Sequence, residues 1–309
     1  MTTATTTAGT TAAIVDVIIP TTCDAARAQS LLRAVDSLLD QRGAVARPVI
    51  VANGPRVEPR LMERLATLPR VRVLRQEEGS LPRAIHTGRV AVRAPFFAFL
   101  DDDDAYMPDA LAQRLERLQA ADQPDAVASN GYSVRPDGGR RLLFAAMAPF
   151  AADPLATLAD TNWLSSCGGL YRTAAVTVEP FAAVPKFFEW TTVAFRLAQR
   201  GHSIGFVEEP TFIITETPGS LSRSLAYDAA APDFVRGLLG HSLPPHVREA
   251  FRRKLVRLEH HAAERHLGHG NRLAALVHHL RSLATPYGLR RNASFTLRLL
   301  TGLPPGATA

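Results

Sequence analysis

Residues 96–111 read FFAFLDDDDAYMPDAL, and this stretch combines a predicted buried strand with a charged turn. The apolar and aromatic side chains of residues 96–100 are typical of a strand inside a sheet. Four carboxylates follow at residues 101–104, and Pro108 suits the first turn of a helix. We therefore expect the carboxylates to lie where a buried strand ends.

Four adjacent negative charges repel one another, and placing them beside an apolar sheet is costly unless something neutralises them. Hard oxygen ligands suit Mg²⁺ or Mn²⁺, which keep part of their water shell and share their coordination sphere with substrate phosphates. The alternative is an acidic turn that caps the next helix, because Asp is favoured at helix N-termini. One Asp would suffice for a cap, so the run of four favours a site for a metal and a diphosphate.

The segments before this run predict a layered α/β fold. Strands are predicted at residues 14–19, 49–52, 71–74 and 96–100. The segments between them carry apolar residues at helical spacing, which is typical of a parallel sheet with helices on both faces. Ligands of such sheets bind beyond the carboxyl ends of the strands. Thr21 and Asn53 fall there together with the four carboxylates.

The second half of the chain contains further strand signals and then becomes helical. Strands are predicted at residues 126–134, 141–144, 204–207 and 212–215. A helix is predicted over 187–200, and the glycine-containing stretch 162–169 is either a loop that lines a pocket or a structural turn. From residue 227 onward the spacing predicts an appended helical subdomain, in which we expect the histidines to be solvated.

The composition is that of an ordinary globular protein, with 46% hydrophobic and 21% charged residues. No apolar run reaches the length of about 18 residues needed to span a bilayer, and no signal-peptide pattern opens the chain, so we expect a cytoplasmic protein. Two cysteines, Cys23 and Cys167, make no disulfide framework. Residues 252–300 hold ten Lys or Arg and two Glu, but no nucleic-acid motif accompanies them, and we expect no nucleic-acid partner.

The order and spacing of these motifs resemble the family 2 glycosyltransferases of the GT-A fold. The resemblance covers about residues 14–224 and rests on VIIPT before the first turn, on LDDDD, and on Glu189 placed seven residues before Arg196. It implies a Rossmann-like mixed sheet flanked by helices, followed by a C-terminal helical subdomain. The expected divisions are a disordered tail (1–13), a GT-A domain (14–225) with a nucleotide-sugar half (14–104) and an acceptor half (105–225), a helical subdomain (226–300) and a tail (301–309).

The resemblance also implies an activity: an inverting transfer of sugar from a nucleotide sugar to a small-molecule or envelope acceptor, with Mg²⁺ or Mn²⁺ on the diphosphate. The residues expected to bind the nucleotide sugar are Pro20, Thr21, Asn53, His86, Asp101 and Asp102. Asp103 is expected to bind the metal, with Asp104 in support. Natural-product biosynthesis is one plausible setting, and the C-terminal helices permit a homo-oligomer.

The sequence departs from the family pattern at three places, and one of them is Ile85 and His86, where relatives often have Arg-Asn. Ala52 and Asn53 stand where many relatives have an Asp that contacts the base, so GDP, UDP and dTDP sugars all stay open as donors. Glu189 is followed by Trp190 where an acidic pair is usual. Either Glu189 itself is the catalytic base, or the acceptor is a low-molecular-weight thiol. Such an acceptor needs little help from a base, because the pKa of a thiol is about 8.5. A non-catalytic nucleotide-sugar binding protein is the third alternative.

Three further side chains are candidates for contact with the acceptor or the donor. Trp163 lies in the glycine-containing stretch, and Trp190 either stacks on the acceptor or packs in the core. Arg223 lies in residues 216–224, which suit either a mobile lid that clamps a phosphate or an exposed linker.

Overall fold

The computed structural model describes residues 12–216 and 224–301. Most of the predicted N-terminal tail, the predicted phosphate clamp Arg223 and residues 302–309 lie outside this part of the chain. The chain divides into two compact units: the first is Met1–Ala152 with Trp163–Thr217, and the second is Asp153–Asn162 with Pro218–Ala309.

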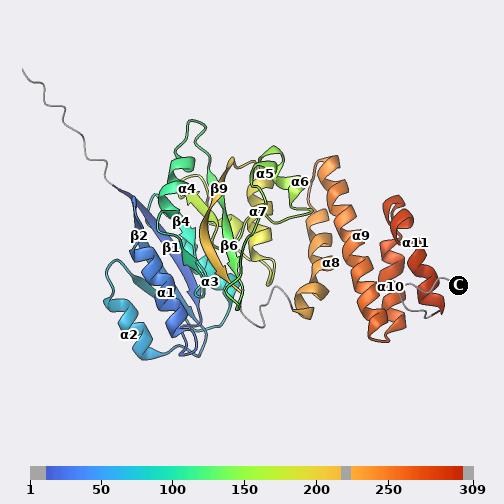
Figure 1. Cartoon of the computed structure of the whole chain (residues 1–309), viewed down its shortest axis with the longest axis horizontal. Coiled ribbons are helices and arrows are strands. Elements are labelled where there is room, and N and C mark those ends of the chain that lie inside the picture. The colour runs from blue at the N-terminus through green and yellow to red at the C-terminus, as the bar shows by residue number, and fades with distance from the viewer. Residues whose placement is uncertain (1–11, 217–223, 302–309) are drawn as a thin grey trace, which may run out of the picture. The chain divides into compact units, whose positions relative to one another are not determined.

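A mixed sheet forms the centre of the first unit (Figure 1), with the strand order β3-β2-β1-β4-β8-β6-β9-β5 and with β7 paired to β6. Its strands are β1 (Ala13–Thr21), β2 (Ala44–Asn53), β3 (Arg72–Gln76), β4 (Phe96–Phe99), β5 (Ala105–Tyr106), β6 (Ala126–Val134), β7 (Arg140–Leu142), β8 (Gly169–Arg172) and β9 (Ile204–Thr215). The strands β3, β2, β1 and β4 are parallel, whereas β8 is antiparallel to both β4 and β6. The predicted mixed α/β sheet is confirmed.

Helices pack against both faces of this sheet. They are α1 (Ala28–Leu39), α2 (Pro59–Thr67), α3 (Leu81–Val90), α4 (Ala110–Leu118), α5 (Ala148–Ala152), α7 (Glu189–Gln199) and the 3₁₀ turn η1 (Glu179–Phe181). Ile19 of β1 shares a core cluster with Leu31 of α1. Ile18 points to the opposite face, where a Cβ on Gly88 of α3 would lie only 2.3 Å from its Cγ2. Gly88 therefore allows α3 to approach β1 closely.

The strands predicted at residues 204–207 and 212–215 form one strand, β9, which corrects the sequence prediction. Its pairing with β6 shifts register near Asn130, so the interrupting residues are absorbed as a bulge. Glu208 lies in this interruption, and its carboxylate accepts hydrogen bonds of 2.7 and 2.6 Å from the backbone N–H groups of Met147 and Ala148 at the start of α5. A polar break in an apolar pattern thus marks a bulge here and not the end of a strand.

The parallel strands end at one edge of the sheet. Thr21 is paired with Ala52 in the register of β1 and β2, and Ile18 is paired with Phe99 in the register of β1 and β4. The backbone N–H of Leu100 donates to the carbonyl of Ile18 at 3.0 Å. This pairing keeps the carboxylate run, which follows at once, beside the end of β1.

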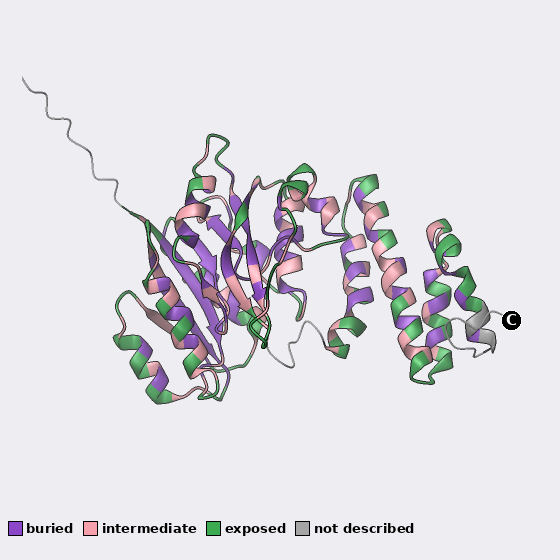
Figure 2. Cartoon of the chain, viewed as in Figure 1, coloured by how far each residue is buried: buried purple, intermediate pink, exposed green. Residues whose placement is uncertain are grey.

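The second unit is helical, and buried and exposed positions alternate along its helices (Figure 2). Its helices are α6 (Pro154–Thr157), α8 (Leu225–Leu239), α9 (Pro245–Gly268), α10 (Arg272–Ser282) and α11 (Pro286–Thr301). Residues 153–162 belong to this unit, although the sequence analysis placed them in the GT-A domain; Lys254 of α9, for example, donates to the carbonyl of Leu158 at 3.1 Å. His279 is 1% exposed and packs edge-on against Phe295, so the expectation that it is solvated was wrong.

Candidate active site

The four carboxylates form a tight turn after β4. The backbone N–H of Asp104 donates to the carbonyl of Asp101 at 3.2 Å, which closes the turn. Because the chain reverses within four residues, neighbouring carboxylates point to different partners.

Asp102 and Asp103 are held by the last residue of β1 and by an arginine that follows it. The Thr21 hydroxyl donates a hydrogen bond of 2.6 Å to Asp102 Oδ2. Arg27 Nη1 lies 3.1 Å from Asp102 Oδ1 and 2.7 Å from Asp103 Oδ2. Burial raises the pKa of Asp102, while Thr21 and Arg27 oppose that rise. The end of β1 thus supplies both a donor and a positive charge to the turn.

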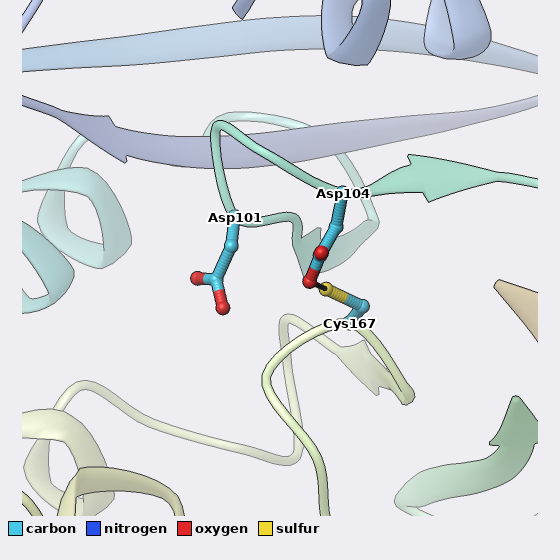
Figure 3. A group of neighbouring side chains, drawn as sticks. All are labelled: Asp101, Asp104 and Cys167. Atoms are coloured by element: carbon cyan, nitrogen blue, oxygen red, sulfur yellow. Dashed lines mark hydrogen bonds between the residues drawn. The ribbon is translucent and has the colours of Figure 1, made fainter. Parts of the chain in front are cut away.

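Asp104 points the other way, toward Cys167 (Figure 3). It is 5% exposed; its Oδ1 accepts from the backbone N–H of Thr215 at 3.0 Å, and its Oδ2 accepts from the Cys167 thiol at 3.2 Å. Burial is the main cause that raises the pKa of Asp104, followed by the charge of Asp101. Burial also raises the pKa of Cys167 well above its usual value, so this thiol is a neutral donor and no thiolate.

Asp101 is half-buried and lies close to other negative charges. Burial is the largest cause that raises its pKa to about 7, and the charges of Asp103, Asp102 and Glu189 add to that rise. A hydrogen bond with Ser166 lowers the pKa in part. Its charged form is therefore poorly compensated by the protein itself.

Asp101, Asp104 and Cys167 offer ligand atoms that all lie within 4.8 Å of one another. Carboxylate oxygens are the hard ligands that Mg²⁺ and Mn²⁺ prefer, and a cation here would relieve the repulsion that adds to the burial-driven rise of both carboxyl pKa values. A protonated thiol is a poor ligand for such a cation, so the two carboxylates are the part of the group that fits one. Asp103, the predicted metal ligand, is paired with Arg27.

Glu189 opens helix α7 and is 6% exposed. Burial raises its pKa, and the backbone N–H groups of Glu189 and Phe187 and the charge of Lys186 oppose the rise. Its charge also acts on Asp101, so the two acids lie within electrostatic reach of each other. The ring of Trp190 is half-buried and meets Phe99 edge-on, with the ring centroids 4.9 Å apart.

The other predicted nucleotide-binding residues lie at or near the same edge of the sheet. Asn53 is 6% exposed and bonds to backbone at both ends: its Nδ2 donates to the Thr21 carbonyl at 2.9 Å, and its Oδ1 accepts from Ser80 N–H at 3.1 Å. Asn53 thus ties β1 to the start of α3. Pro20 is buried in β1, and His86 is half-buried on α3.

Trp163 is 1% exposed, and its ring meets Phe206 edge-on at 5.5 Å. Its ring therefore has almost no surface to offer an acceptor. The structure does not describe Arg223, the other predicted peripheral contact.

Sequence reasoning missed three side chains that contact the carboxylates: Arg27, Ser166 and Cys167. A signal for Arg27 did exist, because four adjacent acids need a cation and Arg27 is the first basic residue after β1. Ser166 and Cys167 lie in the glycine-containing stretch, which was treated as one loop. Their contacts depend on how β8 pairs with β4, and no local pattern encodes that pairing.

Comparison with known proteins agrees with the resemblance found in the sequence. A family model described as glycosyl transferase family 2 matches residues 16–175. The succinoglycan biosynthesis protein ExoO of Rhizobium meliloti (strain 1021) is 33% identical over 116 residues, which are 35% of this chain and 33% of that protein. The chain therefore matches about a third of the length of this curated relative.

Solved structures support the fold. The structure of S. aureus TarS 1-349 in complex with UDP-GlcNAc superposes with a TM-score of 0.59 at 14% identity, covering 84% of this chain and 75% of that chain. A second structure of S. aureus TarS gives a TM-score of 0.54 at 16% identity, covering 79% and 42%. Among the residues that the structure describes, no helix is both long and apolar enough to cross a membrane.

Proposed function

This chain belongs to glycosyl transferase family 2 and is a glycosyltransferase, and we propose that it transfers one sugar from a nucleoside-diphosphate sugar with inversion of the anomeric carbon. The observation that carries the proposal is the position of Glu189 within electrostatic reach of the carboxylate turn. An inverting transfer needs the donor's diphosphate on one side of the anomeric carbon and a proton acceptor on the other. The turn and Glu189 are suited to these two tasks.

The donor would bind along the edge formed by β1, β2 and the carboxylate turn. In this proposal Thr21 and Asn53 shape the nucleoside site, and Asp101 and Asp102 bind the ribose side. Arg27 joins this group, since its side chain keeps 42% of its surface exposed beside Asp102 and Asp103 and can contact a phosphate. The nucleotide sugar in the TarS complex, UDP-GlcNAc, is of the proposed donor class, while GDP and dTDP sugars stay candidates.

A divalent cation, Mg²⁺ or Mn²⁺, would be held by carboxylates of the turn. Asp101 and Asp104 are the candidates from geometry, and Asp103 is the candidate from the family resemblance. When bound, the cation would offset the negative charge of the departing diphosphate. Arg27 would hold Asp102 and Asp103 in place while the sugar is transferred.

Glu189 is the proposed general base. A carboxylate at this position would take the proton of the acceptor as its nucleophile attacks the anomeric carbon from the face opposite the diphosphate. Burial raises the pKa of Glu189, which makes it a stronger base than an exposed carboxylate. Trp190 follows where the family often has a second acid, so Glu189 would act alone.

The acceptor is a small molecule or an envelope component in this proposal, and a low-molecular-weight thiol is the second candidate. The observation that favours a thiol is Trp190, because its ring packs on Phe99 and supplies no second carboxylate. A thiol acceptor would leave much of its turnover intact when Glu189 is replaced by Gln, whereas an alcohol acceptor would not.

The experiment is a thermal-shift panel of UDP, GDP, dTDP, ADP and CMP, each with and without Mg²⁺ or Mn²⁺. A ligand at a hundredfold excess over its dissociation constant stabilises the folded state by about 2.7 kcal/mol. We expect one diphosphate to stabilise the protein only with metal, and Asp101→Asn to abolish the metal-dependent part. Asp122→Asn, an exposed acid in an ion pair with Arg117, is the control. If no nucleotide stabilised the protein with either metal, the proposed donor site would be wrong.

A further inference from the structure

Helix α10 of the helical unit buries one face against the described helices and leaves an apolar face exposed among the residues that the structure describes. Ala275 and His279 lie on the buried face. The opposite face is exposed to between 38% and 75%, and green positions run along α10 in Figure 2. At about 100° per residue its apolar side chains form one continuous stripe. We call it the α10 stripe, and it consists of Leu273, Leu276, Val277 and Leu280.

Arginines border the α10 stripe on both sides. At helical spacing Arg272 adjoins Leu276, and Arg281 adjoins Val277. Both arginines are exposed, and Arg281 makes no ion pair with any residue that the structure describes. Residues 265–309 contain six Arg and no Asp or Glu. The stripe therefore lies in a strongly positive part of the chain with no acids of its own.

A cleft of about 390 Å³ adjoins the stripe at Arg281. Arg236, Arg252 and Arg281 line it together with apolar side chains such as Leu255. Its one acid, Glu259, is 1% exposed and is already paired with Arg236 and with His278. The charges of Arg252 and Arg281 are thus left without an acidic partner among the residues described.

We propose that the α10 stripe docks onto an anionic phospholipid surface, with its apolar side chains in the interface and phosphate headgroups at Arg281 and in the adjoining cleft. An exposed apolar face bordered by Arg is the pattern of helices that lie in a membrane interface, and anionic headgroups supply the missing negative charge. A second copy of the chain fits less well, because its stripe would bring the same arginines together with no acid between them. This docking is independent of the sugar transfer proposed above.

The test is flotation of the full-length chain with vesicles. We expect it to bind vesicles that contain phosphatidylglycerol about tenfold or more tightly than vesicles of phosphatidylcholine alone, and to lose affinity as salt rises. The variant Leu273→Gln/Leu280→Gln should bind the anionic vesicles about tenfold more weakly, because its stripe is half polar. Leu225→Gln is the matched control, since Leu225 is 69% exposed on α8 of the same unit.

A second variant tests the charges. Arg252→Gln/Arg281→Gln should weaken binding to anionic vesicles and flatten its salt dependence, while its weak binding to neutral vesicles stays unchanged. The proposal fails if the wild-type chain binds vesicles with and without phosphatidylglycerol equally. It also fails if Leu273→Gln/Leu280→Gln and Leu225→Gln bind the anionic vesicles with equal affinity. It also fails if sedimentation shows a dimer that the stripe variant loses while vesicle binding is absent; the stripe would then bind a second copy. Circular dichroism confirms that each variant is folded.

Discussion

Each unit of this protein buries carboxylates, but the two sets have opposite surroundings. Glu259 in the helical unit is 1% exposed and is paired with Arg236 on one oxygen and with His278 Nδ1, at 2.7 Å, on the other. Asp101 in the first unit shares its turn with three other acids and lies within reach of Glu189. One unit pairs its acid with an arginine and an imidazole, and the other gathers negative groups together.

The difference separates a structural acid from a candidate functional one. A buried carboxylate with a hydrogen-bond partner on each oxygen and an arginine among them already has its negative charge balanced, and its role is to hold the fold together. A cluster of carboxylates with one shared arginine is incomplete, and it gains stability when a cation arrives. Burial alone does not distinguish the two cases; the sign of the neighbouring charges does.

The largest effect that tests this distinction is expected at Glu189. Glu189→Gln should lower the rate of sugar transfer to an alcohol acceptor by about 10²- to 10⁴-fold, because the amide cannot take a proton. The metal-dependent thermal shift with the donor nucleotide should persist. Steady-state kinetics and thermal shift measure the two properties separately. Glu179→Gln is the control, since Glu179 is an exposed acid paired with Arg200.

If Glu189→Gln and Glu179→Gln retained equal turnover with every alcohol acceptor, Glu189 would not be a general base. Full turnover restricted to thiol acceptors would instead favour the S-glycosyltransferase reading, because a thiol ionises without a strong base.

A structural acid should behave in the reverse way. Glu259→Gln should lower the free energy of unfolding by about 3 kcal/mol, because it breaks a buried pair, and should leave nucleotide binding unchanged. Urea unfolding followed by circular dichroism measures the loss. Glu249→Gln, which breaks the exposed pair with Arg253, should cost less than about 1 kcal/mol. Equal losses in the two variants would show that Glu259 is no more structural than a surface acid.

The sequence predicted where the carboxylate turn lies in the sheet better than it predicted the contacts of each carboxylate. Apolar runs located the strands, and the rule that parallel strands end at one edge brought Thr21 and the carboxylates together. The pattern could not show that the turn sends Asp103 to Arg27 and Asp104 to Cys167, because these directions depend on backbone reversal within four residues. For the same reason Trp163 read as a pocket residue, although tertiary packing buries it against Phe206.

The pH dependence of stability is the next smaller effect. The folded state raises the pKa of Asp101 from 3.8 to about 7, so it holds this proton more tightly than the unfolded chain does. The contribution of Asp101 to the free energy of unfolding is therefore fully present below its unfolded pKa of 3.8. It is lost as the pH rises through about 7. In the presence of a chelator, the free energy of unfolding of the wild-type chain, measured by urea titration, should fall over this window by about 2 kcal/mol after allowance for solvent screening. The free energy of unfolding of Asp101→Asn should depend less on pH over this window. If the pH curves of the wild type and Asp101→Asn ran parallel, Asp101 would not be the group that causes the loss.

The smallest effect compares one arginine from each unit. Arg27→Gln removes the positive charge shared by Asp102 and Asp103, and because its side chain is 42% exposed we expect a loss of only about 1 kcal/mol. Arg281→Gln removes an arginine that has no ion pair among the described residues, so its unfolding free energy should stay within about 0.5 kcal/mol of wild type. Mg²⁺ should restore more stability to Arg27→Gln than to Arg281→Gln, because a cation in the turn replaces the lost charge. Equal responses of the two variants to Mg²⁺ would mean that Arg27 does not balance the carboxylates, and the contrast between the two units would then rest on Glu259 alone.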